Sequence, residues 1–149
     1  MKRIFVVFVL AIVIIFGIEN VMMAASKKDQ ARAMVRKAIQ FYKANGKEKT
    51  LEVITAGKFK KEELYVFAYS TEGVMIAHPE NKALIGKNLI EVPDDAGKLF
   101  RKEIVEKAKA SGTGWVDYKY KNPKTDKVEN KTTYFKKIDD IIFLCGVYK

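Results

Sequence analysis

Two residues that occur once each, His78 and Trp115, are the first candidates for a chemical role. His78 directly precedes Pro79 at the end of an expected strand, and its imidazole can hydrogen-bond a carboxylate. The same side chain can instead hold the loop from Pro79 to Gly86, and the residues alone leave both roles open. Trp115 opens a later strand after Gly114. It either packs in the core or forms the wall of a small-ligand pocket.

Aromatic residues alternate along two expected strands. Tyr118 and Tyr120 are two residues apart and therefore share one face of their strand. In a pocket, a tyrosine ring supplies an apolar wall and its hydroxyl donates to a ligand oxygen, whereas the alternative is two ordinary half-buried tyrosines. Tyr65, Phe67 and Tyr69 line one face of an earlier strand. Core packing is the default for them, and the floor of a pocket is the second option.

The residue counts exclude several classes of catalytic and metal site. One cysteine excludes an internal disulfide and a Cys-x-x-Cys motif, and one histidine excludes a multi-histidine zinc site. No nucleophile elbow, phosphate-binding loop, zinc-protease motif or dinucleotide fingerprint occurs. The neighbours Asp94 and Asp95 are interpreted as the start of a helix rather than a catalytic pair. We therefore expect no enzymatic activity, no metal and no cofactor.

The chain is basic, and the kind and distribution of its basic residues indicate a solvated surface. The 149 residues carry a formal net charge of +10, but only four of the 28 basic residues are arginines. Arginine is the side chain preferred for reading phosphates and bases, and the lysines here are interleaved with acidic residues. This pattern argues against nucleic acid as a partner. It allows weak attraction to an anionic membrane surface.

The N-terminus has the layout of a secretory signal peptide. Basic residues precede an uncharged apolar run over residues 4–18, and the small residues Ala24 and Ala25 fit a cleavage site. An uncleaved anchor in the inner membrane is the alternative, because the run can be extended with its polar pair near the membrane boundary. We predict that residues 1–25 export or anchor the chain. Residues 26–149 are then one domain in the periplasm or another extracytoplasmic space.

Periodicity predicts helices first and a sheet afterwards. Apolar residues recur at helical spacing over residues 26–45, 48–56 and 95–110, and residues 81–93 form an irregular connection. Strand segments rich in aromatic and β-branched residues are expected at 64–69, 74–78, 115–120, 131–137 and 141–148.

The connections and the apolar pattern of these strands indicate a fold class. The first two strands form a hairpin, and the last three are joined by short turns. The last strand is apolar on both faces, which predicts a central position in the sheet with Cys145 buried inside it. The fold class is therefore α+β, with an antiparallel sheet flanked by helices.

The order of these segments resembles the single Cache domain, an extracytoplasmic ligand-binding module related to PAS folds. The resemblance covers roughly residues 30–149 and rests on FYKANGKEKTLEVI, GKF, LYVFAYSTEGVMIAHPENKALIGKNL, GWVDYKYKNP and ENKTTYFKKIDDIIFLCGVYK, in that order. It implies a five-stranded antiparallel PAS-like sheet, a long N-terminal helix packed on it, and a small-molecule pocket on one side. Family members commonly sense small organic acids, amino acids or similar metabolites as the outer part of a chemoreceptor or sensor kinase.

The resemblance also singles out Lys131 and Tyr134 in a Lys-x-x-Tyr stretch. Lys131 is predicted to bind an anion, because a buried ammonium needs a counter-charge that a ligand carboxylate can supply. Tyr134 is predicted to donate its hydroxyl beside it. Residues three apart face opposite sides of a regular strand, so this pairing requires a bulge or a later strand start. The predicted ligand-binding residues are His78, Trp115, Tyr118, Lys131, Tyr134, Phe67 and Tyr120.

Two functions follow from these observations. The first is a sensor domain without its own output module, which binds a small carboxylate and is read by a membrane receptor or sensor kinase, with a homodimer as a further option. The second is a ligand-free basic module that binds an envelope protein or an anionic membrane surface. Surface attraction weakens as ionic strength rises, whereas a buried carboxylate contact persists.

Overall fold

Two consecutive helices open the described part of the chain, which comprises residues 25–149 of a computed structural model. Helix α1 spans Lys27–Asn45 and helix α2 spans Lys47–Thr55. The Ser26 hydroxyl caps α1 by accepting a backbone N–H of the first turn, and Gly46 separates the helices with a φ of 81°. Both predicted helices are confirmed. The predicted signal peptide or anchor lies outside the described residues, apart from its last position.

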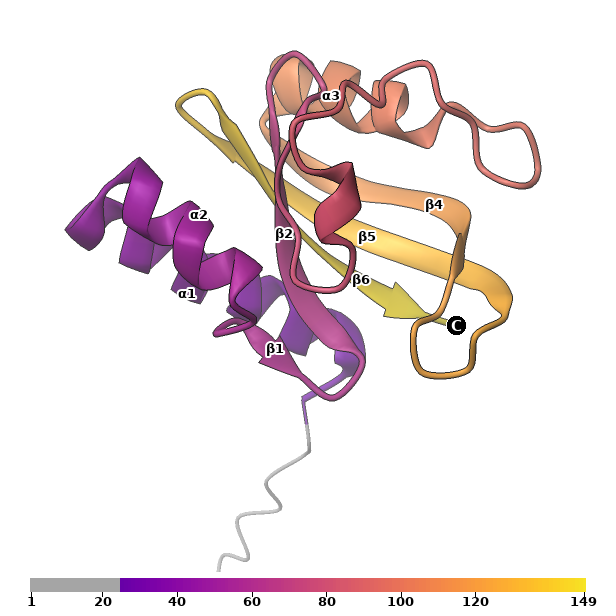
Figure 1. Ribbon diagram of the computed structural model, residues 1–149, viewed down its shortest axis with the longest axis horizontal. Coiled ribbons are helices and arrows are strands. Elements are labelled where there is room, and N and C mark those ends of the chain that lie inside the picture. The colour runs from indigo at the N-terminus through magenta and orange to yellow at the C-terminus, as the bar shows by residue number, and fades with distance from the viewer. Residues whose placement is uncertain (1–24) are drawn as a thin grey trace, which may run out of the picture.

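One antiparallel sheet follows, as Figure 1 shows. Its strands are arranged in the order β1-β2-β6-β5-β4, and β3 pairs with β2. Strand β6 is therefore central, as its apolar faces predict, and Cys145 is buried in it. The strands are β1 (Lys60–Lys61), β2 (Leu64–Ser70), β3 (Met75–Ala77), β4 (Thr113–Lys121), β5 (Val128–Ile138) and β6 (Ile141–Tyr148).

All five expected strands are present, and the described residues contain a sixth. The addition is the two-residue strand β1, which pairs with the start of β2. Its two exposed lysines carry no apolar alternation, so periodicity gives no signal for it. The α+β class with an antiparallel sheet is confirmed, and the strand number changes from five to six.

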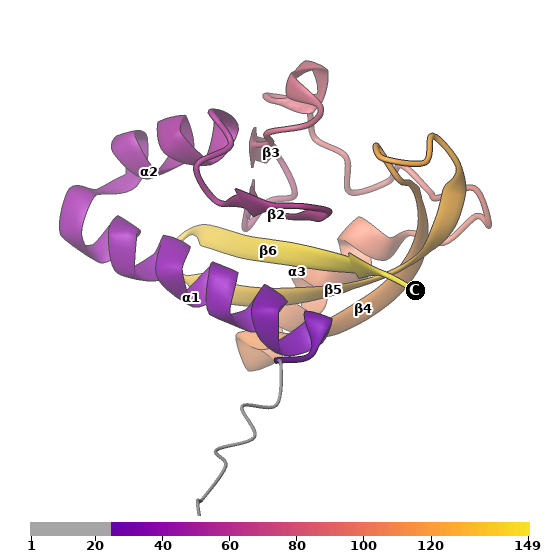
Figure 2. The same ribbon diagram turned by 90° about the horizontal axis from the view of Figure 1, so that it is seen from below.

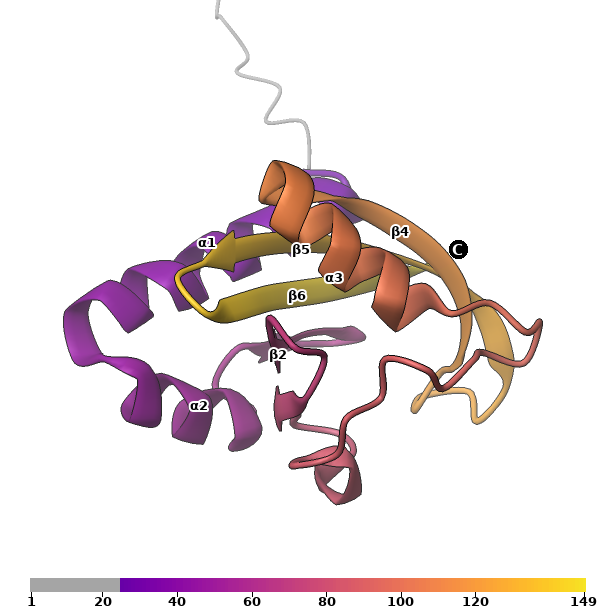
Figure 3. The same ribbon diagram turned by 90° about the horizontal axis from the view of Figure 1, so that it is seen from above.

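The helices form two layers, one on each side of the sheet. Figure 2 shows α1 and α2 along one side, and Figure 3 shows α3 (Phe100–Ser111) across the other. Each side has its own apolar core. The core under α1 includes Val35, Phe143 and Cys145, whereas the core under α3 includes Phe135 and Leu144. We call these two sides of the sheet the α1 face and the α3 face.

The connection before α3 differs from the expectation. The helix begins at Phe100, not near residue 95, and no side chain caps it. Asp94 instead accepts the backbone N–H groups of Ala96 and Lys98 with one carboxylate oxygen, and that of Lys119 with the other. The interpretation of Asp94 as a helix cap is therefore wrong. The carboxylate forms a turn and fastens it to β4.

Within residues 25–149, no helix is both long and apolar enough to span a membrane.

Candidate functional site

The strand β5 places Lys131 in the interior of the α3 face. The strand pairs in regular register with β4 and β6 along its length, so its side chains alternate strictly between the two faces. Lys131 lies on the same face as Phe135, and its exposed fraction is 1%. A lysine this deeply buried is rare unless it is paired. The groups that surround Nζ of Lys131 therefore determine its charge state and what it can bind.

Four aromatic rings surround the Lys131 ammonium. Its Nζ donates to the Tyr65 hydroxyl at 2.9 Å and to the Tyr148 hydroxyl at 3.4 Å. The centres of the rings of Tyr65, Tyr148, Tyr120 and Phe67 lie 4.5, 4.6, 5.3 and 5.6 Å from Nζ. We call Lys131 with these four residues the lysine cage. The ring faces attract a cation and partly replace its lost water.

A glycine of the neighbouring strand leaves room for this lysine. Gly146 lies in the central strand β6, and a Cβ placed on it would collide with Cε of Lys131. It would also lie 2.6 Å from Oγ1 of Thr133. The lysine stem therefore crosses β6 over a position that has no side chain. A glycine inside a strand often marks such a close approach.

The Lys131 ammonium lacks a carboxylate partner among residues 25–149. The two acidic residues of the adjoining cleft have partners of their own: Glu80 pairs with Lys60 at 2.6 Å, and Asp126 pairs with Lys121 at 2.7 Å. Burial without a counter-charge lowers the pKa of Lys131 to about 7. The site thus holds a buried lysine that loses its proton more readily than a solvent-exposed one.

His78 lies beside the lysine cage, and its exposed fraction is 2%. Its ring centre is 5.3 Å from that of Tyr65 and 5.5 Å from that of Phe67. Nδ1 accepts the backbone N–H groups of Glu80 and Asn81, so the proton of the neutral ring is on Nε2. Burial, followed by the nearby cations of Lys131 and Arg101, lowers the pKa of His78 to about 3. The ring is therefore neutral at neutral pH.

The two roles considered for His78 are compatible in this geometry. Nδ1 holds the loop after Pro79, as one of the two roles requires. Within residues 25–149 no group accepts from Nε2, although no polar side-chain atom of this part of the chain is both fully enclosed and unpartnered. Nε2 therefore retains contact with solvent-accessible space. Its N–H is available to a ligand oxygen.

A cleft of about 330 Å³ opens beside the cage. Tyr65 and Tyr120 belong to both the cage and the cleft lining, whereas Lys131 is not among the lining residues. A ligand of a few heavy atoms fits this volume. The cleft is lined by Tyr65, His78, Glu80, Asn81, Tyr120, Lys121, Pro123 and Asp126.

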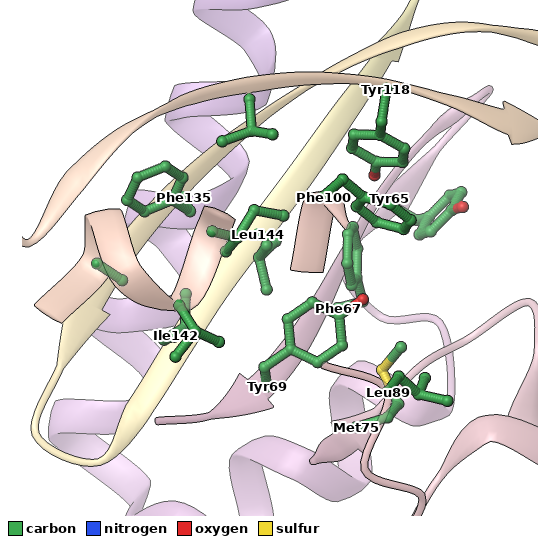
Figure 4. Packing of buried hydrophobic residues seen from close by; sticks show 14 residues of the cluster. Tyr65, Phe67, Tyr69, Met75, Leu89, Phe100, Tyr118, Phe135, Ile142 and Leu144 are labelled. Atoms are coloured by element: carbon green, nitrogen blue, oxygen red, sulfur yellow. The ribbon is translucent and has the colours of Figure 1, made fainter. Parts of the chain in front are cut away.

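Tyr118 and Phe67 occupy the expected face but are core residues. Figure 4 shows them with Tyr65 and Phe100 among the packed side chains of the α3 face. The Tyr118 ring is stacked on Phe100 with ring centres 3.9 Å apart, and its hydroxyl shares a 2.8 Å hydrogen bond with Thr133. Phe67 is thus both a core residue and a member of the cage, whereas Tyr118 supports the cage by packing on Tyr120 with ring centres 6.0 Å apart.

Trp115 and Tyr134 lie on the opposite face of the sheet. They pack together at a ring-centre distance of 5.4 Å, against the core under α1. The expectation that Tyr134 stands beside Lys131 is wrong, because β5 contains no bulge and begins three residues before Lys131. Trp115, predicted as a ligand-binding residue together with Phe67, cannot line one pocket with it, because the sheet separates the two side chains.

The structure adds three residues that the sequence reading did not assign to the site. Tyr148 and Gly146 belong to β6, and Tyr65, expected first as core, belongs to β2. The glycine inside an otherwise apolar strand was a usable signal. Strand alternation placed Tyr65 on the face of Phe67, with a pocket floor as its second option, whereas Tyr148 gave no signal. The pairing of β6 with both β2 and β5 brings the two tyrosines to the lysine.

The antiparallel sheet thus lies between helical layers, with a small polar site embedded in aromatic side chains on its α3 face. A family model described as the Cache domain matches residues 18–147. The chain belongs to the Cache domain family. Cache domains are ligand-binding sensor domains rather than enzymes, and they act outside the cytoplasm.

Solved structures share this fold. One is a methyl-accepting chemotaxis protein from Vibrio parahaemolyticus RIMD 2210633, with a TM-score of 0.72 and 22% identity over 81% of this chain and 87% of that one. Another is a periplasmic sensor domain of a chemotaxis protein, with a TM-score of 0.63 and 23% identity over 78% and 86%. A third, a Cache chemosensory domain described for carboxylic acid recognition, has a TM-score of 0.63 and 23% identity over 78% and 84%. No curated protein matches the chain.

Proposed function

We propose that this chain is an extracytoplasmic sensor domain that binds a small carboxylate-bearing metabolite at the lysine cage. The observation that carries the proposal is the buried Lys131 ammonium, which has two phenol partners but no carboxylate among the described residues. An unpaired buried charge costs several kcal/mol, and a ligand carboxylate would offset that cost. The likeness to a domain described for carboxylic acid recognition supports the same ligand class.

The ligand would enter through the cleft and displace the rings of Tyr65 and Tyr120 from the path to Lys131. Its carboxylate would accept from Nζ of Lys131 and from Nε2 of His78, whose ring is already fixed by its other nitrogen. Phe67 would form the apolar wall behind the acid. The paired state of Glu80 and Asp126 at the mouth reduces their repulsion of an incoming anion.

The ligand-bound state would be transmitted to a partner of the domain. Residues 1–25 would export or anchor the domain, and a membrane receptor, a sensor kinase or a second copy of the chain would read the bound state. Helix α1 is the element that would transmit it, because it directly follows residues 1–25 and packs on β6 and β5, the strands that carry Gly146 and Lys131. No chemical reaction is part of this function.

A melting-temperature screen with small organic acids and amino acids tests the ligand proposal. A ligand at about 100 times its Kd stabilises a protein by roughly 2.7 kcal/mol, which raises Tm by several degrees. We expect the rise for short carboxylic acids, at low and at high salt. Lys131→Met should abolish it, whereas Lys136→Met, an exposed position of the same strand, should retain it. Equal shifts in wild type and Lys131→Met would refute the assignment.

A second candidate function, attraction to an anionic surface, has one observation in its favour. A groove of about 320 Å³ between α1 and β5 is lined by four cations and no carboxylate. The cations are Arg32, Arg36, Lys43 and Lys136. Binding to vesicles of anionic lipid that disappears at high salt, and with Arg36→Gln and Lys43→Gln, would favour this function. The absence of any rise in Tm with the acids of the screen, measured on folded protein, would count against the sensor function.

A further inference from the structure

We propose that Lys131 condenses reversibly with the carbonyl carbon of a 2-oxo acid, so that the lysine cage holds this ligand class as a covalent imine. The inference rests on the proposed function, because the acid must first reach the cage. It adds a chemical bond to that function and narrows the ligand class. A plain carboxylic acid would bind at the same place without forming the bond.

The surroundings of Nζ favour a nucleophilic amine. An ammonium has three N–H groups, and the hydroxyls of Tyr65 and Tyr148 accept two of them. Loss of the third proton breaks no hydrogen bond within residues 25–149 and leaves a lone pair. Burial without a carboxylate favours this loss, as in the desolvated lysines that form Schiff bases. The same lysine on the surface would remain protonated and unreactive.

The condensation balances without any oxidant or reductant. The Nζ lone pair forms a bond to the carbonyl carbon, and an N–H proton is transferred to the carbonyl oxygen. The C–O bond of this adduct then breaks, and the oxygen leaves as water after taking a second proton. The nitrogen lone pair forms the C=N bond. Amine and carbonyl thus become imine and water, and the hydroxyls of Tyr65 and Tyr148 lie close enough to Nζ to relay the protons.

The cage suits the product better than it suits the free ammonium. A protonated imine is a delocalised cation, and the four ring faces around Nζ attract such a cation. A 2-oxo acid carries its carboxylate on the carbon next to the new C=N bond. It therefore brings the missing counter-charge into covalent reach, with Nε2 of His78 as a further donor. Simple aldehydes lack this charge and would be held less well.

Reductive trapping tests the proposal on the whole chain. The protein is incubated near pH 7.4 with pyruvate and sodium cyanoborohydride, which reduces an imine to a stable secondary amine, and its peptides are mapped by mass spectrometry. An ordinary lysine is only about one-thousandth neutral at this pH, so the other lysines act as internal controls. We expect an adduct of pyruvate, less one water and plus two hydrogens, on Lys131 at least about tenfold above any other lysine. Excess acetate should suppress it by competition.

The outcomes separate the covalent step from the sensor function. If acetate and pyruvate both raise Tm but no adduct forms on Lys131, the imine is refuted and carboxylate binding stands. An adduct spread evenly over surface lysines would also refute it. If no acid of the screen, pyruvate included, raises Tm, the proposed function fails and the imine fails with it. Because wild-type peptides carry the measurement, the test does not depend on a variant that folds.

Discussion

Both faces of the sheet set basic side chains over aromatic rings, but in opposite environments. On the α1 face, Nζ of Lys28 and Cζ of Arg32 lie 5.0 and 5.3 Å from the centre of the Trp115 ring, and the Arg32 side chain is half exposed. On the α3 face, Lys131 lies in a cage with an exposed fraction of 1%. Water solvates the first pair of cations, so their contacts add little. The second cation has lost its water and must be compensated from within the protein or by a ligand.

A cation lying over an aromatic ring therefore does not by itself indicate a functional site. A cation over a ring fastens α1 to β4 where solvent screens it. Around Lys131 the same contact surrounds a desolvated charge, whose burial is costly and which we propose as the binding site. The difference arises from Gly146, which allows the lysine stem to lie across the central strand and under the rings.

The largest expected effect comes from filling the space at Gly146. Gly146→Ala puts a Cβ into Cε of Lys131 and close to Thr133, so it should destabilise the fold by about 3 kcal/mol. Chemical denaturation measures the change. Combination with Lys131→Ala removes the obstructing stem and should recover a large part of the loss. If the double variant loses as much as the two single variants together, the two positions do not share this space.

Lys131→Met removes the unpaired charge and keeps an unbranched side chain that is only slightly shorter. Without ligand, the free energy of unfolding should rise by about 2 kcal/mol, because a desolvated cation is replaced by an apolar group. Acid binding should be lost at the same time. Lys28→Met on the α1 face is the matched control and should change stability by less than about 0.5 kcal/mol. A destabilised Lys131→Met would mean that the cage fully compensates the charge.

Stability should also depend on pH in a window set by Lys131. In the native chain its pKa is about 7, whereas an unfolded lysine keeps its proton up to about pH 10.4. Between these values the unfolded chain binds more protons, so native stability rises with pH, by at most about 1.4 kcal/mol per pH unit. Below pH 7 both states are protonated and the full cost of burial applies.

Denaturation of wild type and Lys131→Met at pH 6, 8 and 9 checks this window. The advantage of the variant should shrink as pH rises. Acid affinity of the wild type should decrease over the same range, because the ammonium loses its proton. An unchanged difference between the two proteins at all three pH values would contradict the lowered pKa.

The smallest expected effect is on the α1 face. Arg32→Gln removes one cation from the Trp115 ring and one exposed ion pair with Asp29, so it should cost no more than about 1 kcal/mol. Acid binding at the cage should be unchanged, since the sheet lies between. Thermal unfolding and the acid screen together provide the check. A loss of acid binding would show that the two faces are coupled through the sheet.

The sequence by itself determined the succession of elements and the position of β6. Helical spacing and strand alternation are local properties, so α1, α2 and the five longer strands are found within a few residues of their predicted bounds. Strand alternation also indicated correctly that Lys131 and Tyr134 face opposite sides of the sheet. The Cache resemblance was confirmed by the family match. Lys131 was identified from it and His78 from the residues themselves, and their ligand contacts stay predictions.

Only the tertiary structure decided which residues surround Lys131. Tyr65, Gly146 and Tyr148 come from strands whose register is set by long-range pairing, and no local pattern encodes that register. The turn at Asp94 was missed because its carboxylate bonds to β4, far along the chain. The environment of a buried charge is a property of the packed sheet, since desolvation depends on every element that covers the group. The sequence could single out the lysine, but only the fold buries it among aromatic rings, where its charge is costly.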